Sequence, residues 1–244
     1  MRRFFIPPHE MGKYESVISG DDAHHLRDVL KLQPDELVVV FDGQGREFRA
    51  RILSITRRHV RVAMLERVEA ETEAVLDLTI GQGYLKDKKM DVLVRQLTEL
   101  GVVRWIPFLS ARSIPSPDPE RLKGRYKRWQ KISTESLKQC RRSRAMIITP
   151  VVRFEEVLKQ AESYDFKVIF WEGAKAEDAM HRRRLPKPSR PFLVIGPEGG
   201  FDAQEIALAK QNGFEVAGLG PRILKAETAA LVAAALAQFV FGDI

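Results

Sequence analysis

The stretch Val194-Ile195-Gly196-Pro197-Glu198-Gly199-Gly200-Phe201 decides the fold of this chain, together with the later stretch Leu219-Gly220-Pro221-Arg222-Ile223-Leu224-Lys225-Ala226-Glu227-Thr228. Each begins with apolar residues typical of a buried strand, breaks at Gly-Pro and continues into a helix. A single Gly-Pro pair is most simply a turn. Two pairs at neighbouring strand ends indicate a cleft, in which bare backbone N–H and C=O groups bind a flat, polar ligand.

The residues between these two stretches predict one strand–helix–strand unit. Residues 192–195 form the first strand, and Asp202 begins a helix in a capping box completed by Glu205. Gly213 ends that helix, residues 215–219 form the next strand, and a helix over about 226–241 follows.

Upstream of this unit, strands and helices alternate in the same way. The apolar pattern predicts strands at 76–80, 103–109, 147–148 and 168–171, and helices at 90–100, 119–140 and 155–161. Such alternation favours an α/β domain with a mostly parallel sheet and helices on both faces. Ligands of such sheets lie at the carboxyl ends of the strands, so the ends near Trp171, Gly196 and Leu219 are expected to form the site.

The first 70 residues have a different pattern. They predict strands at 36–41, 47–55 and 60–65, a hairpin turn at 42–45 and a short helix within 21–32. Short strands at this spacing favour a small β-barrel. The acidic residues 66–73 are interpreted as a linker, which gives an N-terminal domain at 1–70 and a C-terminal domain at 74–244.

Composition excludes several classes of protein. The 244 residues, 44% of them hydrophobic, are enough for one large domain or two smaller ones with a packed core. No apolar run reaches the ~18 residues of a membrane span, and the first residues lack the apolar core of a signal peptide. Cys140 is the only cysteine, so a reducing cytoplasm is expected. No Cys or His cluster has the spacing of a metal site, and we predict no metal.

The charge is unevenly distributed. Residues 1–72 hold 12 basic and 12 acidic side chains, so the whole net charge of +7 lies in residues 73–244. Between Arg121 and Arg144, ten basic residues stand against one acid, Glu135, with Tyr126 and Trp129 among them. A solvated helix face normally mixes both signs, so this segment and a second basic cluster at 182–187 predict a polyanionic partner.

Other motifs were weighed and set aside. Gly81-Gln82-Gly83 follows a predicted strand, but the third glycine of a dinucleotide fingerprint is replaced by Lys86. No Walker sequence and no Gly-x-Ser-x-Gly elbow occur. Cys140 lies beside Arg141 and could be an activated thiolate, although a small residue at a helix end is the simpler interpretation.

The GPEGG sequence at 196–200, followed by LGPRILKAETAA at 219–230, resembles the SPOUT (α/β-knot) methyltransferases, and within them the RsmE-type family. The resemblance covers nearly the whole chain. It implies an N-terminal PUA-like RNA-binding barrel, and a C-terminal domain whose last ~80 residues form a deep trefoil knot, a rare exception to ordinary topology. It further implies methylation of uridine N3 in 16S ribosomal RNA of the small subunit, with S-adenosylmethionine as cofactor.

The resemblance also implies residue roles. The expected cofactor-binding residues are Trp171, Glu172, Gly173, Ile195, Gly196, Pro197, Gly199, Gly200, Leu219, Gly220, Pro221, Ile223, Leu224, Glu227 and Thr228. Arg222 and Glu198 are the candidate catalytic residues. Arg222 would hold uracil oxygens or a phosphate, or else stabilise the knot; Glu198 would position substrate, or else cap a helix. The group that removes the N3 proton stays open among Glu198, Glu172 and solvent.

The predicted partners are RNA and a second copy of the chain. The expected RNA-binding residues are Arg2, Arg3, His25, Arg27, Lys31, Lys86, Lys88, Arg125, Arg128, Arg141, Arg142 and Arg144. The apolar helix at 229–241 calls for burial on more than one side, and the resemblance implies a homodimer through the C-terminal domain. The chain departs from the family at Lys31, Gln96, Lys138, Lys225 and Ala226. Two alternatives stay open: a SPOUT enzyme acting on 2′-hydroxyls or transfer RNA, and a non-catalytic RNA-binding assembly factor.

Overall fold

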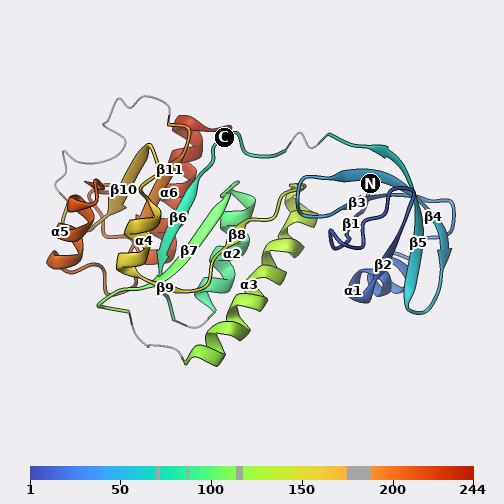
Figure 1. Cartoon of the computed structure of the whole chain (residues 1–244), viewed down its shortest axis with the longest axis horizontal. Helices are drawn as coiled ribbons and strands as arrows, with labels where there is room; N and C mark the ends of the chain where they lie inside the picture. Colours follow the sequence, from blue (N-terminus) through green and yellow to red (C-terminus); the bar gives the residue numbers. More distant parts are fainter. Residues whose placement is uncertain (70–71, 87, 114–117, 175–187) are drawn as a thin grey trace. The chain divides into compact units, whose positions relative to one another are not determined.

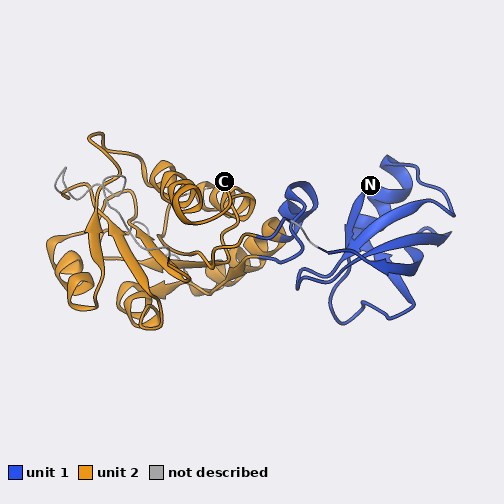
Figure 2. Ribbon diagram, turned by 90° about the horizontal axis from the view of Figure 1, so that it is seen from above, with its two compact units in different colours: residues 1–73, 134–145 blue, residues 74–133, 146–244 orange. Residues whose placement is uncertain are grey.

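A computed structural model describes residues 1–69, 72–86, 88–113, 118–174 and 188–244. The chain divides into two compact units, which Figure 2 distinguishes by colour. Unit 1 comprises residues Met1–Glu73 and Thr134–Ala145, and unit 2 comprises Ala74–Ser133 and Met146–Ile244. This division differs from the predicted boundary at one place, because residues 134–145 join the N-terminal segment.

Unit 1 is built on a single five-stranded sheet. Its strands are β1 (Arg3–Phe5), β2 (Glu15–Ser19), β3 (Leu37–Phe41), β4 (Glu47–Ile55) and β5 (His59–Arg67), in the order β1-β3-β4-β5-β2. Side chains alternate along β4, so Ala50 and Ile52 are fully buried in the core while Arg49 and Arg51 point away from it. Helix α1 (Gly20–His24) and the π-helical turn η1 (His25–Val29) close this core with Ala23 and Leu26.

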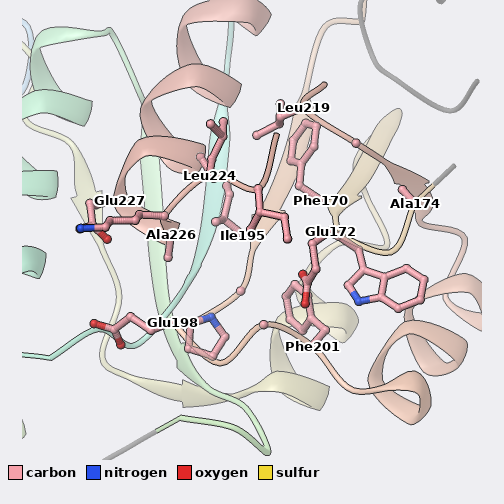
Figure 3. A pocket seen from close by; sticks show the side chains of 18 of the residues that line it. Phe170, Glu172, Ala174, Ile195, Glu198, Phe201, Leu219, Leu224, Ala226 and Glu227 are labelled. Carbon is pink, nitrogen blue, oxygen red and sulfur yellow. The ribbon is translucent and has the colours of Figure 1, made fainter. Parts of the chain in front are cut away.

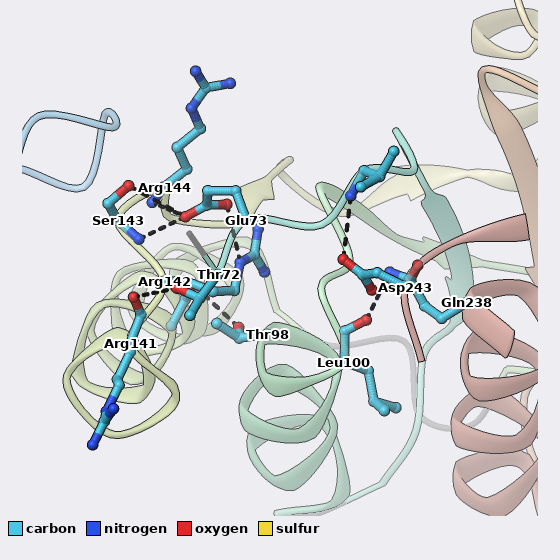
Figure 4. A network of polar contacts seen from close by, with 12 residues as sticks. Thr72, Glu73, Thr98, Leu100, Arg141, Arg142, Ser143, Arg144, Gln238 and Asp243 are labelled. Carbon is cyan, nitrogen blue, oxygen red and sulfur yellow. Dashed lines mark hydrogen bonds and ion pairs between the residues drawn. The ribbon is translucent and has the colours of Figure 1, made fainter. Parts of the chain in front are cut away.

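The expected small barrel is a curled five-stranded sheet, in which no pairing joins β1 to β2 among the described residues. One expectation for unit 1 needs correction. The acidic linker is shorter than predicted, because β5 extends to Arg67 and Glu73 is held by hydrogen bonds. Figure 4 shows the Glu73 carboxylate accepting the backbone N–H groups of Ser143, at 2.6 Å, and Arg144, at 2.7 Å.

Unit 2 is the predicted α/β domain. Its sheet has the order β12-β10-β11-β6-β7-β8, with β9 also on β7, and every pairing is parallel. The strands are β6 (Thr79–Gly83), β7 (Arg104–Leu109), β8 (Ile147–Ile148), β9 (Val152–Arg153), β10 (Phe166–Phe170), β11 (Pro191–Ile195) and β12 (Glu215–Ala217). The helices are α2 (Lys89–Glu99), α3 (Pro119–Cys140, whose residues from Thr134 on belong to unit 1), α4 (Phe154–Gln160), α5 (Ala203–Gln211) and α6 (Ala226–Phe241).

The helices lie on both faces of this sheet (Figure 1). Successive residues of a strand point to opposite faces, so Leu193 and Ile195 of β11 join the core shared with α2, α3 and α6. Phe192 and Val194 join the core shared with α4 and α5. Burial on both faces explains the continuous apolar run of β11. None of the helices in the described part of the chain is both long and apolar enough to cross a bilayer.

Local signals located most elements of unit 2. The capping box of α5 is present, with Glu205 N–H donating to Asp202 at 2.8 Å and Asp202 N–H donating to Glu205 at 3.1 Å. The strand predicted at 76–80 is displaced, because β6 covers Thr79–Gly83. Gly81 is needed inside that strand: a Cβ there would lie 3.2 Å from both the Phe192 ring and Val157.

Candidate functional site

A pocket of about 480 Å³ opens in unit 2, at the carboxyl ends of the neighbouring strands β12, β10 and β11. Three loops line it: the turn after β10, the glycine loop after β11, and the segment between β12 and α6. Figure 3 shows Phe170 and Glu172 on one side of the pocket, and Glu198 and Glu227 on the other. A crevice at this edge of a parallel sheet is where α/β folds bind ligands.

The glycine loop, residues 196–200, makes a sharp turn in which three of the five residues are glycines. Gly200 has a φ of +67° and donates its N–H to the Pro197 carbonyl at 3.0 Å. A Cβ on Gly200 would collide with the Glu172 carboxylate, and one on Gly196 would lie 3.1 Å from the Phe201 ring. The backbone of this loop therefore approaches its neighbours more closely than residues with a Cβ allow.

The end of β6 supports the glycine loop from behind. Gln82 is fully buried, and its Nε2 donates to the carbonyls of Gly83, at 3.0 Å, and Gly196, at 3.3 Å. Gly83 lies directly against the turn, since a Cβ there would overlap the Pro197 nitrogen and lie 2.6 Å from the Gly196 carbonyl carbon. The Gly81-Gln82-Gly83 motif therefore serves the pocket, although it is no dinucleotide fingerprint.

A charged cluster links two of the pocket loops to helix α2. Lys89 Nζ lies 2.9 Å from Glu198 Oε1 and 3.5 Å from Glu227 Oε1. Glu198 Oε1 also accepts the Lys86 backbone N–H at 3.3 Å. The hydrogen bond from Lys89 to Glu198 raises the pKa of the Lys89 ammonium, so Lys89 stays charged at neutral pH.

The pocket gathers most of the predicted site residues. These are Trp171, Glu172, Ile195, Gly196, Pro197, Glu198, Gly199, Gly200, Leu219, Gly220, Pro221, Arg222, Ile223, Leu224 and Glu227. Gly173 and Thr228 do not line it. The pocket is also lined by residues outside the predicted set, namely Lys89, Phe170, Ala174, Phe201, Gly218, Lys225, Ala226 and Ala229. Phe170 and Phe201 directly flank predicted segments and could have been included, whereas no local signal marks Lys89.

Arg222 lines the pocket with an exposed side chain. Among the described residues it makes no hydrogen bond and no ion pair, so the contact to a carbonyl that a knot-stabilising role requires is absent there. Glu198 does not cap a helix, because the N-cap of α5 is Asp202. Arg222 is thus available to a ligand or substrate, whereas one oxygen of Glu198 is already bound by Lys89 and Lys86.

The predicted RNA-binding residues divide into exposed and buried groups. Arg2, His25, Lys31, Arg141 and Arg144 are exposed on unit 1, and Lys86, Lys88 and Arg128 on unit 2. Arg125 is half-buried with its guanidinium over the Tyr84 ring, and Arg27 is paired with Asp28, whose hydrogen bond raises the pKa of the guanidinium. The basic cluster at 182–187 lies outside the described residues.

Arg3 and Arg142 do not fit the predicted role. Arg3 is paired with Glu47 and donates to the Arg142 carbonyl at 2.9 Å. The Arg142 side chain is only 4% exposed and contacts Glu73 at 3.3 Å (Figure 4). Trp129, predicted as part of the basic segment's surface, is fully buried against Trp105. Buried groups of this kind stabilise the fold and are not accessible to phosphates.

Comparison with known proteins follows the same two-part organisation. A family model described as an RNA methyltransferase domain matches residues 72–238, and one described as an RNA methyltransferase PUA domain matches residues 18–65. The chain is 29% identical to the ribosomal RNA small subunit methyltransferase E of Bacillus subtilis, over 96% of this chain and 94% of that protein. It is also 29% identical to the enzyme of the same name from Aquifex aeolicus, over 87% and 89%.

Two solved structures resemble the whole chain. A ribosomal RNA small subunit methyltransferase E from Neisseria gonorrhoeae, bound to S-adenosylmethionine, has a TM-score of 0.87 with 29% identity, covering 100% of this chain and 99% of that one. A methyltransferase from Legionella pneumophila with the same bound cofactor has a TM-score of 0.89 with 27% identity, covering 99% and 98%.

The close approach at Gly83 can be tested by unfolding in denaturant. Replacing Gly83 with Ala should reduce the free energy of unfolding by about 2 kcal/mol, because the added methyl group overlaps the Pro197 turn. Gly124→Ala is the matched control: its Cβ meets nothing within 4 Å on α3, and it should stabilise the chain by about 0.5–1 kcal/mol. Equal stability of Gly83→Ala and the wild type would contradict the assigned contact.

Proposed function

Because the chain belongs to the RNA methyltransferase family, we propose that it transfers the methyl group of S-adenosylmethionine to N3 of a uridine in 16S RNA of the small ribosomal subunit. The observation that carries this proposal is the pocket formed by three strand-end loops at the carboxyl edge of the sheet. Relatives named ribosomal RNA small subunit methyltransferase E match over nearly the full chain, and a PUA domain model matches the N-terminal unit. The reaction would take place in the cytoplasm, where small subunits are assembled.

The pocket residues suit such a cofactor. Residues 196–200 and 219–224 offer backbone N–H and C=O groups, which can recognise the polar edge of an adenine. Phe170, Ile195 and Leu219 add apolar surface for its faces. When bound, S-adenosylmethionine supplies an activated methyl group on a sulfonium. The chain then has to orient the nucleotide for in-line attack and to exclude water.

The path of the chain supports a knot in this region. In the sheet, β10 lies between β11 and β12. The chain therefore passes across β10 on its way from the end of β11 to the start of β12. It then returns through α6, which packs against β11, β6 and α2. We include the trefoil knot in the proposal, with its loops forming the cofactor site.

The reaction can be tested on small ribosomal subunits with labelled S-adenosylmethionine. Wild-type protein should place one methyl on uridine N3, detected by nucleoside mass spectrometry. Arg222→Ala should keep cofactor affinity in calorimetry but lower kcat by about a hundredfold, since this exposed cation would hold charge that develops on the uracil. Lys210→Ala on α5 is the control and should retain full activity. Full activity of Arg222→Ala would make Arg222 dispensable, and methyl on a 2′-hydroxyl would refute the assigned target.

We propose that RNA binds the exposed basic residues of both units, without Arg3 and Arg142. Binding should weaken steeply with salt, because each neutralised phosphate releases counterions. The double change Arg141→Ala with Arg144→Ala should reduce the slope of log K against log salt by about 1.5, the amount for two lost phosphate contacts. The double change Lys159→Ala with Lys210→Ala is the control. An unchanged slope in the Arg141/Arg144 variant would exclude this loop from the interface.

We propose a homodimer through unit 2. Phe239 and Val240 on α6 are 72% and 52% exposed, and Val92 on the adjacent helix α2 is 45% exposed. Large exposed apolar side chains on packed helices are typical of a subunit interface. Light scattering at micromolar concentration should give twice the chain mass, and Phe239→Glu should shift it to the monomer. A wild-type monomer at that concentration would contradict the proposal.

A further inference from the structure

Two carboxylates from different loops share one ammonium at the pocket. Glu198 belongs to the glycine loop and Glu227 to the first turn of α6, and Lys89, the first residue of α2, contacts both. Figure 3 shows the two carboxylates on the same side of the pocket. Like charges so close together repel each other, and the ammonium between them offsets this repulsion. Lys89 therefore fixes where both carboxylates lie.

The two carboxylates differ in the hydrogen bonds that the folded chain makes to their oxygens. Glu198 Oε1 accepts from both Lys89 Nζ, at 2.9 Å, and the Lys86 N–H, at 3.3 Å. Glu227 Oε2 is buried and has no hydrogen-bond partner among the described residues. A buried carboxylate oxygen without a donor costs free energy, unless a ligand supplies the donor. A half-turn of the carboxylate would only exchange its two equivalent oxygens, so the Glu227 side chain, which is 29% exposed, has to rotate about its other bonds to turn an unpartnered oxygen toward a ligand.

We propose that Glu227 accepts the N3 proton of the target uridine, with Lys89 as the residue that positions it; this inference rests on the proposed function. In the step, the proton leaves N3 for the Glu227 carboxylate, which becomes a carboxylic acid. The N3 electron pair forms the bond to the methyl carbon. The electron pair of the broken S–C bond stays on sulfur, which becomes a neutral thioether. Glu227 then loses the proton to solvent.

The other candidate groups are less suitable. Glu198 already accepts two hydrogen bonds on one oxygen, and Glu172 lies on the opposite side of the pocket beside Gly200. After Glu227 is neutralised, Lys89 still holds its charged partner Glu198, so the cluster does not have to rearrange during the reaction.

An acceptor at this place also selects the base. N3 of uracil carries a proton and donates, whereas N3 of cytosine is itself an acceptor. A cytosine facing Glu227 would bring two acceptors together and leave both without a partner, which is costly in a closed site. The same residue thus removes the proton and discriminates between the pyrimidines.

The test compares Glu227→Gln with the matched control Glu155→Gln on α4, an exposed glutamate that does not line the pocket, using small subunits and labelled S-adenosylmethionine. The amide keeps the shape of the glutamate but cannot take a proton. Glu227→Gln should lower kcat at least ~100-fold, the usual contribution of a general base, with the calorimetric Kd for the cofactor within about threefold of the wild type. Its residual rate should rise about tenfold per pH unit from 7 to 8.5, because only ionised uridine reacts. Glu155→Gln should keep the wild-type kcat and lack this pH dependence.

Substitutions at Lys89 provide a second part of the test. Lys89→Met should lower kcat with little change in cofactor Kd, and Lys89→Arg should restore most of it, because a cation between the carboxylates is regained. A Glu227→Gln enzyme with wild-type kcat, or one that loses cofactor binding together with activity, would overturn the inference. If the wild-type protein forms no N3-methyluridine, the proposed function itself is overturned. This result is obtained before any variant is made, so the two failures are distinguishable.

Discussion

The pocket depends on the close approach of two backbones, at Gly83 and at the Gly196–Pro197 turn. Strand β6 lies in the middle of the sheet between β11 and β7, so its carboxyl end meets the loop that leaves β11. With no side chain at Gly83, this loop lies directly on the end of β6, and the buried Gln82 amide binds the Gly196 carbonyl. Close-packed interiors leave no room for an extra methyl group here, so the position of the loop follows from the sheet.

The segment that follows β6 extends the same support to the charged side of the pocket. Helix α2 begins at Lys89, which reaches Glu198 in one loop and Glu227 in the other. The segment from β6 to the start of α2 therefore holds the pocket loops in three ways. Gly83 packs against the Gly196–Pro197 turn, the Gln82 amide binds the Gly196 carbonyl, and the Lys89 ammonium contacts Glu198 and Glu227. Held in this way, two loops far apart in sequence present their carboxylates together, as a preorganised site requires.

The parts of the site that could be predicted from sequence are those with a local signal. Gly-Pro breaks after apolar runs located the loops at 196–200 and 219–224, and the Asp202–Glu205 box located the start of α5. Contacts across long separations leave no such signal. Lys89 meets Glu198 at a separation of 109 residues and was not predicted, whereas the basic pattern around Arg142 predicted an RNA contact although Arg142 is buried by Glu73. Strand β6 was misplaced because glycines inside a strand resemble a turn.

The segment between β12 and α6 separates two chemical environments. Ile223 is 84% exposed and Arg222 and Lys225 also face outward, while Glu227 is held inside by Lys89. Three cations and three carboxylates line the pocket, so its formal charge balances. The exposed cations suit a polyanion, and the pocket carboxylates suit a cationic sulfonium and an N–H donor. Because one short segment carries Arg222 and Lys225 within five residues of Glu227, a phosphate bound by these cations would lie close to the carboxylate that we propose as the proton acceptor.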